Sequence, residues 1–195
     1  YVIEFKDKID FDGKNAIIAQ AYFLRAYYNF ELVKWFGPIP IKPEARFAVG
    51  DEQSLPRAST EDVYSYIEQD LLAAIESLPA TASQAGRITQ GAAQSLLGKA
   101  YLYQGKFEEA ATVLDQVINS ERYSLVSDYE SIFENEGENG PGSIFEVQYT
   151  DLEGASFDCF QCSEGNIAVG FNGIRQYNGP LFDSGFSFNV PTQEL

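Results

Sequence analysis

Two amphipathic helices are predicted between Gly91 and Ser120, and this stretch constrains the fold more than any other part of the chain. In each half, apolar residues recur three and four positions apart, which places them on one face of an α-helix. Gly105 separates the halves, and glycine readily adopts the positive φ that ends a helix. The two apolar faces consist of Ala93, Leu96, Leu97, Ala100 and Tyr101, and of Phe107, Ala110, Ala111, Leu114, Val117 and Ile118.

Small residues matter as much as large ones in this helix pair. Gly98 and Ala110 allow two backbones to approach closely, and we expect Tyr101 and Phe107 to fill the wedge where the helices splay apart. Their spacing is that of the tetratricopeptide repeat, although an unrelated helix hairpin is the alternative. Such a repeat is a scaffold and does not itself name a function. The matching residues are Leu97, Gly98, Tyr101, Gly105, Phe107 and Ala110.

A second helix pair of the same type is predicted upstream, over Asn15–Phe36 and Thr60–Leu78. Proline residues after Gly37 end the first helix. Ser59 and the acidic residues after Thr60 form a capping signature for the second. The predicted buried stripes are Ile17, Ala21, Leu24, Tyr28, Leu32 and Trp35 in the first helix, and Val63, Ile67, Leu71, Ala74, Ile75 and Leu78 in the second.

The first of these helices is unusually aromatic between Tyr22 and Phe36. Aromatic rings on a helix can stack on sugars, but we favour their burial against neighbouring helices, with Trp35 structural. Arg25 lies among these rings, and we expect it to pair with a buried carboxylate or with helix carbonyl groups.

The remainder of the chain is predicted to contain little regular structure. Alternating residues over Ser143–Tyr149 indicate a short strand. Beyond Thr150 the helical periodicity disappears, which is typical of an irregular segment packed on a scaffold. The predicted fold is therefore mostly α, with tetratricopeptide-like helix pairs, one short strand and a long loop-rich segment. We expect a single domain over residues 1–195, with the scaffold at about 15–120 and the loop-rich segment at about 121–195.

Composition excludes several classes of function. The net charge of −16 argues against nucleic acid or an anionic membrane surface as partner. The chain contains no histidine, which excludes histidine-based catalysis and His-ligated metal sites within it. No apolar run approaches the ~20 residues that span a bilayer. Asp10–Gly13 could begin a calcium loop, but a solvated turn is favoured, and we expect no cofactor and no metal site.

Several stretches, taken in order along the chain, resemble one known family. The strongest are Leu24–Tyr28, Phe36–Gly37 followed by Pro40, and Arg57–Ser59 at the entry to the next helix. Together they resemble the SusD/RagB family of Bacteroidetes, and the resemblance covers nearly the whole chain. The stretches that carry it are residues 21–41, 57–79, 86–118, 142–149 and 191–195.

The resemblance implies an outer-membrane lipoprotein displayed at the cell surface, where it captures oligosaccharides or polysaccharides without catalysis. It also implies a SusC-like TonB-dependent transporter as partner, through which the glycans are imported. Family members are considerably longer, so we expect this chain to be a piece of a longer protein, with the lipid anchor outside it. A peptide-binding nutrient receptor of the same type and a protein-binding tetratricopeptide adaptor remain alternatives.

Candidate ligand-binding residues lie in the loop-rich segment, because sugars need flat apolar faces and planar polar groups. Glycines and a proline around residues 173–180 predict a surface turn that presents Tyr177 as a stacking platform. The phenylalanines of this segment are interpreted instead as anchors to the helices. The candidate ligand-binding residues are Asn172, Arg175, Gln176, Tyr177 and Asn178.

Cys159 and Cys162 form the C-x-x-C motif of the chain. Two cysteines without histidine cannot complete a tetrahedral zinc site. A local disulfide is the favoured interpretation at an oxidising cell surface, and two free thiols are the alternative. Carboxylates are plentiful, but no spacing selects a glycosidase pair, and no catalytic residue is predicted. We expect the helix-hairpin face to contact the transporter or the rest of the protein, and not the sugar.

Overall fold

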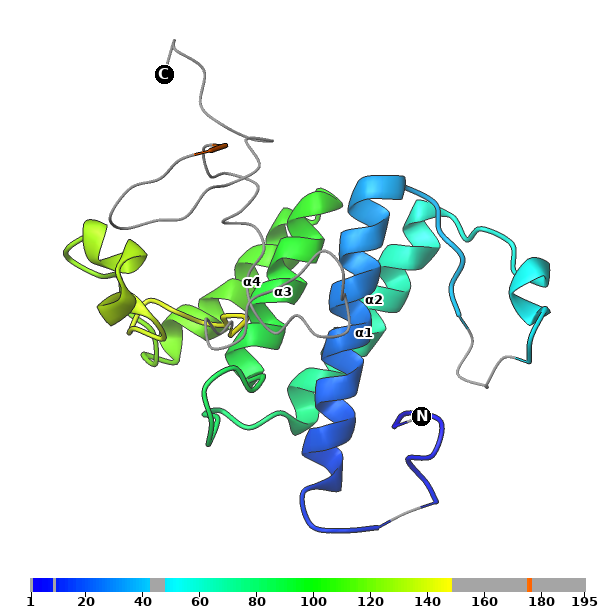
Figure 1. The fold of residues 1–195 in the computed structure, drawn as a ribbon, viewed down its shortest axis with the longest axis horizontal. Helices are drawn as coiled ribbons and strands as arrows, with labels where there is room; N and C mark the ends of the chain where they lie inside the picture. Colours follow the sequence, from blue (N-terminus) through cyan, green and yellow to red (C-terminus); the bar gives the residue numbers. More distant parts are fainter. Residues whose placement is uncertain (1, 9, 43–47, 149–174, 177–195) are drawn as a thin grey trace. The chain divides into compact units, whose positions relative to one another are not determined.

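A computed structural model describes residues 2–8, 10–42, 48–148 and 175–176 of the chain (Figure 1). The chain divides into two compact units, Tyr1–Glu146 and Val147–Leu195. The described residues of the second unit are 147–148 and 175–176, so the architecture below is that of the first. The single domain expected over residues 1–195 stays a prediction.

Four α-helices form the scaffold of the first unit (Figure 1). Helix α1 packs along α2, α2 along α3, and α3 along α4, so neighbours in sequence are neighbours in space. Both predicted helix pairs are confirmed, with bounds within two residues of those expected. The helices are α1 (Lys14–Phe36), α2 (Thr60–Ser77), α3 (Gln90–Tyr103) and α4 (Phe107–Asn119), and short 3-10 turns occupy Asp51–Ser54, Glu130–Phe133 and Asn135–Gly137.

Local chemistry sets the ends of these helices. The Ser59 hydroxyl accepts a hydrogen bond from the Asp62 amide at 3.1 Å, which confirms the predicted cap of α2. The Thr89 hydroxyl caps α3 in the same way by accepting from the Ala92 amide. Gly105 adopts a φ of 73° between α3 and α4, as expected of a glycine that ends a helix.

The core lies between the helices and contains small and large residues in alternation. Gly98 has no room for a side chain, because a Cβ there would lie 2.6 Å from Leu114 Cγ. This contact confirms the predicted close approach of α3 and α4. Phe107, however, is the first residue of α4 and is 68% exposed, so its predicted place in the wedge is wrong. The largest fully buried side chains are Phe23, Phe30, Val63, Ile67, Leu71 and Leu97.

The predicted buried stripe of α1 is also wrong. The buried face carries Ala19, Phe23, Ala26, Phe30 and Val33 instead. The two alanines let α2 approach closely, and the two phenylalanine rings fill the remaining space in the core. Both faces of the helix are apolar, so periodicity alone could not decide between them. Within the described residues, the stripe that was predicted to be buried lies on the exposed side of α1.

Arg25 joins α1 to α2 through a buried carboxylate, as expected. Its Nε and Nη2 donate to the two carboxylate oxygens of Asp70, each at 2.7 Å. The side chain of Asp70 is 5% exposed and that of Arg25 is 22% exposed. The Arg25 guanidinium also lies over the rings of Tyr22 and Tyr66. Aromatic faces and a bidentate carboxylate together compensate for the partial burial of this charge.

The short strand expected over Ser143–Tyr149 is absent from the part of it that the structure describes. Residues 143–148 are irregular, and Tyr149 lies outside the described residues. Within the described ranges, no residue lies in a β-strand or in a β-bridge. Phe145 instead packs its ring edge-on against Phe23 of α1, with centroids 5.5 Å apart.

Candidate ligand-binding cleft

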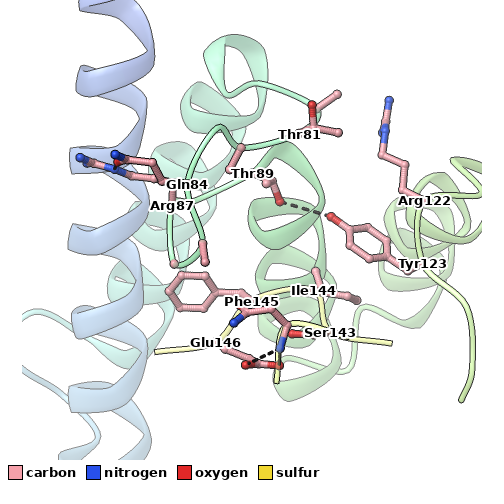
Figure 2. A pocket seen from close by; sticks show the side chains of 15 residues that line it. Thr81, Gln84, Arg87, Thr89, Arg122, Tyr123, Ser143, Ile144, Phe145 and Glu146 are labelled. Atoms are coloured by element: carbon pink, nitrogen blue, oxygen red, sulfur yellow. Dashed lines mark hydrogen bonds between the residues drawn. The ribbon is translucent and has the colours of Figure 1, made fainter. Parts of the chain in front are cut away.

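A cleft of about 260 Å³ opens at one end of the helices (Figure 2). It is formed by the loop that joins α2 to α3, by the segment that follows α4, and by residues 139–146. All of these belong to the first compact unit. The lining residues are Ala80, Thr81, Ala82, Gln84, Ala85, Gly86, Arg87, Thr89, Arg122, Tyr123, Asn139, Ser143, Ile144, Phe145 and Glu146.

The loop between α2 and α3 is tied to the helices at its two ends. The Gln90 amide donates to the Pro79 carbonyl at 2.9 Å, which brings the ends of the loop together. Ile88 is buried in the core and anchors the loop from within. Gly86 takes a φ of 77° at the tip, and Arg87 Nε donates to Gln84 Oε1 at 3.2 Å. The cleft therefore has one wall fixed by packing and by hydrogen bonds.

Two aromatic side chains line the cleft from segments that are distant in sequence (Figure 2). Phe145 is held by its contact with Phe23. The Tyr123 hydroxyl lies 3.3 Å from the Thr89 hydroxyl. The Tyr123 ring crosses α3 at Gly91, where an added Cβ would lie 2.5 Å from the Tyr123 oxygen. Only a glycine leaves room for the ring at this point, so the position of Tyr123 depends on the sequence of α3.

Charged and polar groups complete the lining. The backbone amide of Asn139 donates to both carboxylate oxygens of Glu146 at 3.1 Å, so this side chain is held in place. Arg87 and Arg122 also line the cleft, and both residues are exposed. The cleft therefore combines aromatic surface with guanidinium, carboxylate, amide and hydroxyl groups. This combination suits a ligand with apolar ring faces and many hydroxyl groups, which is the chemistry of a sugar.

The described residues that line the cleft do not include a hydrolytic pair of carboxylates. Glycoside hydrolysis usually needs two carboxyl groups on opposite sides of the bond that is cleaved. Glu146 is the one acidic residue among the described residues that line the cleft. Across the described ranges, no group of three or more histidine, cysteine or acidic residues is arranged to hold a metal ion.

The structure describes two of the candidate residues from the loop-rich segment. Arg175 and Gln176 are exposed and lie in a turn, and Gln176 has a φ of 61°. A turn at this point agrees with the prediction for residues 173–180. Asn172, Tyr177 and Asn178 lie outside the described residues, as do Cys159 and Cys162. Their roles in ligand binding and in a disulfide stay predictions.

Sequence reasoning did not find the cleft. Its lining comes from three separate segments between Ala80 and Glu146, and no local pattern shows that these segments meet. Phe145 was assigned to a strand and Tyr123 was not singled out. The position of Gly91, at the start of α3, is explained by its contact with the Tyr123 ring.

The paired helices form a scaffold of the tetratricopeptide kind, with a cleft built from loops at one end. The chain belongs to the SusD-like family. The family model, described as "Starch-binding associating with outer membrane", matches residues 3–102, which include α1, α2 and nearly all of α3. The resemblance drawn from the sequence motifs is thereby confirmed. Among the described residues, no helix is both long enough and apolar enough to cross a membrane.

Two curated relatives are SusD-like proteins of Formosa agariphila and Bacteroides ovatus. The first is 32% identical over 139 residues, which cover 69% of this chain and 28% of the relative. The second is 28% identical over 185 residues, which cover 87% of this chain and 33% of the relative. The chain thus spans about a third of the length of the curated relatives it matches.

Solved structures give the same result for the fold. A laminarin-binding SusD-like protein superposes with a TM-score of 0.85 and 32% identity, over 99% of this chain and 45% of that one. A surface glycan-binding protein A from Bacteroides fluxus has a TM-score of 0.77 and 26% identity, over 92% and 39% of the two chains. The mostly α fold expected from the sequence is confirmed by these similarities.

Proposed function

We propose that this chain is part of a surface glycan-binding protein that captures oligosaccharides for import through a TonB-dependent uptake system. The observation that carries the proposal is the similarity to a laminarin-binding SusD-like protein over 99% of this chain. That protein is described as laminarin-binding. For this chain we propose a broader class of ligand, the neutral glycans.

Binding without catalysis is the role proposed for the protein. The cleft supports this role because its described lining offers aromatic surface and polar side chains together with a single acidic residue. Both carboxylate oxygens of Glu146 also accept a hydrogen bond from the Asn139 amide. A glycosidase would need a second carboxyl group at the cleft.

The proposed location is the outer face of the outer membrane, and the proposed partner is a SusC-like transporter. The family description, which refers to association with the outer membrane, supports this location. A lipid anchor outside these 195 residues would attach the protein. The face of α3 and α4 that we expected to avoid sugar has Ala93, Ala100 and Ala110 buried in the helix packing, in agreement with a structural role.

The test is a binding measurement on the full protein with a panel of neutral glycans that includes laminarin and starch. Calorimetry is expected to show saturable binding of at least one glycan, and chromatography is expected to show that the glycan stays intact. Oligopeptides of similar size form the comparison arm. Binding of peptides alone, or release of shortened glycans, would contradict the proposal.

We further propose that residues 172–178 contribute to the glycan site, with Tyr177 as a stacking platform beside Arg175 and Asn178. Loss of such a platform costs on the order of 1–3 kcal/mol by analogy with stacking on bases, or roughly tenfold to a hundredfold in affinity. Tyr177→Ala in the full protein is expected to weaken binding by that factor with little change in thermal midpoint. Tyr129→Ala, at an exposed aromatic residue remote from this segment in sequence, is the control. Equal affinity in both variants would remove Tyr177 from the site.

A further inference from the structure

Gly91 is a glycine inside a helix, at a position where the backbone does not require one. It is the second residue of α3, and its φ lies outside the positive range that favours glycine at Gly105. Glycine in an ordinary helical position destabilises a helix relative to alanine, because it loses more backbone entropy on folding. The presence of a glycine here is therefore explained by what surrounds it.

The Tyr123 ring occupies the space that a side chain at position 91 would need. A Cβ added to Gly91 would lie 2.5 Å from the Tyr123 hydroxyl oxygen, 2.8 Å from Cε2 and 3.0 Å from Cζ. All three atoms belong to the outer end of one side chain, and no backbone atom is among them. We therefore expect a Gly91→Ala variant to displace the ring and to leave α3 in place.

Thr89 holds the same ring at its hydroxyl end (Figure 2). The Tyr123 and Thr89 hydroxyl oxygens lie 3.3 Å apart, and Thr89 also caps α3 by accepting from the Ala92 amide. The oxygen of a capping threonine is fixed by the end of the helix, so it supplies a fixed point for the phenol. A ring displaced in Gly91→Ala would lose this hydrogen bond.

The segment that carries Tyr123 is joined to the other wall of the cleft by a backbone hydrogen bond. The Ser124 amide donates to the Pro141 carbonyl at 2.9 Å, which connects the segment after α4 to residues 139–146. Phe145 lies in that second segment and lines the cleft, as Tyr123 does. The contact with α3 therefore fixes one aromatic side chain of the cleft directly and is linked to the segment that carries the other.

We propose that Gly91 is a positioning residue for glycan binding: because it has no side chain, the Tyr123 ring lies against α3 and forms aromatic surface that a sugar meets. This inference rests on the proposed function and adds that the cleft at Tyr123 is part of the glycan site. Gly91 is not among the residues that line the cleft, so it acts through Tyr123. A ring that is already in place favours affinity, because side chains that become ordered on binding cost free energy.

Gly98 offers a matched comparison on the same helix. It lies seven residues, about two turns, after Gly91. An added Cβ there would lie 2.6 Å from Leu114 Cγ, a similar overlap. Leu114, however, packs against the core and does not line the cleft. Gly91→Ala and Gly98→Ala therefore make the same chemical change, one beside the cleft and one inside the scaffold.

The first measurement is the affinity of the full protein for laminarin and for starch, by calorimetry. Tyr123→Ala is expected to weaken binding roughly tenfold to a hundredfold, by analogy with the loss of an aromatic platform for a base. Gly91→Ala is expected to weaken it roughly tenfold, with a change of no more than about 3 °C in thermal midpoint. Gly98→Ala is expected to lower the thermal midpoint and to leave the affinity unchanged. In a protein that already carries Tyr123→Ala, Gly91→Ala should cause no further loss of affinity.

The second measurement is the crystal structure of the Gly91→Ala variant without ligand. The Tyr123 and Thr89 hydroxyl oxygens are expected to separate beyond hydrogen-bonding distance, while the path of α3 stays the same. In Gly98→Ala the two oxygens should remain in contact. A Tyr123 ring that keeps its place in Gly91→Ala would overturn the proposal whether or not a glycan binds.

The binding results separate failure of this inference from failure of the proposed function. Unchanged affinity in Tyr123→Ala, with binding by the unaltered protein, would remove the cleft from the glycan site and leave the proposed function standing. A loss in Gly91→Ala that persists beside Tyr123→Ala, or an equal loss in Gly98→Ala, would assign the effect to the fold and overturn the role of Gly91. An unaltered protein that binds no glycan would contradict both, although the crystal structure would still decide whether Gly91 positions the ring.

Discussion

Removal of the charge on Arg25 tests how much the contact between α1 and α2 depends on one ion pair. Arg25 and Asp70 form two hydrogen bonds of 2.7 Å, and the Asp70 side chain is only 5% exposed. Arg25→Met keeps most of the side-chain length but leaves the Asp70 carboxylate buried without its main partner. Breaking a buried pair in this way costs about 3–5 kcal/mol. For a chain of this size, that corresponds to a fall of about 6–20 °C in thermal midpoint.

The matched control is Lys34→Met. Lys34 and Glu31 are separated by the same 2.7 Å, but their side chains are 25% and 35% exposed. Water screens such a pair, so its removal is expected to change the stability little. The comparison therefore varies burial while it holds the distance between the charged atoms constant.

The assay is urea unfolding of the purified protein, followed by circular dichroism at helical wavelengths. A double variant, Arg25→Met with Asp70→Leu, removes both charges and is expected to recover most of the stability lost in Arg25→Met. A buried pair replaced by apolar residues is often neutral in stability. The reasoning would be refuted if Arg25→Met cost no more than Lys34→Met, or if the double variant were less stable than the single one.

Three further predictions follow from the packing and the cleft. Gly98→Ala is expected to destabilise the protein by about 1–3 kcal/mol through overlap with Leu114, and a double-mutant cycle with Leu114→Ala should show strong coupling. Burial raises the pKa of Tyr64 and Tyr101 above the usual value of 10. Folding therefore favours their neutral form, so the contribution of these two groups to stability should be constant below pH 10 and fall as the pH rises beyond it, less steeply in Tyr64→Phe. Arg87→Ala is expected to weaken glycan binding about tenfold if the cleft takes part, whereas Lys99→Ala on α3 should not.

The helices could be predicted because their signals are local. The cap at Ser59 and the break at Gly105 depend on residues within one turn, and both were found where they were expected. The pairing of Arg25 with a buried carboxylate was also predictable in kind, since a guanidinium among aromatic rings needs a partner. Asp70 could not be identified as that partner, because it lies 45 residues away on another helix.

The orientation of α1 could not be predicted for a different reason. Its two faces carry similar apolar content, and the choice between them depends on the shape of α2. Ala19 and Ala26 allow the close approach that Leu24 and Tyr28 would prevent. Periodicity counts apolar residues but does not measure this difference in size. The prediction for Phe107 was also wrong: this residue is the first of α4 and its side chain is exposed.

The cleft was invisible to sequence analysis because the residues that build it also belong to the scaffold. Phe145 lines the cleft with one part of its ring and packs against Phe23 with another. Tyr123 reaches the cleft across Gly91 of α3 and meets Thr89, the residue that caps the same helix. The contacts that stabilise the helices therefore also fix the aromatic surface of the cleft before any ligand arrives. A ligand that meets a prearranged surface does not lose affinity to the ordering of side chains. The repeat scaffold thus fixes the shape of its loops, while its own alanine-rich interior is buried in helix packing.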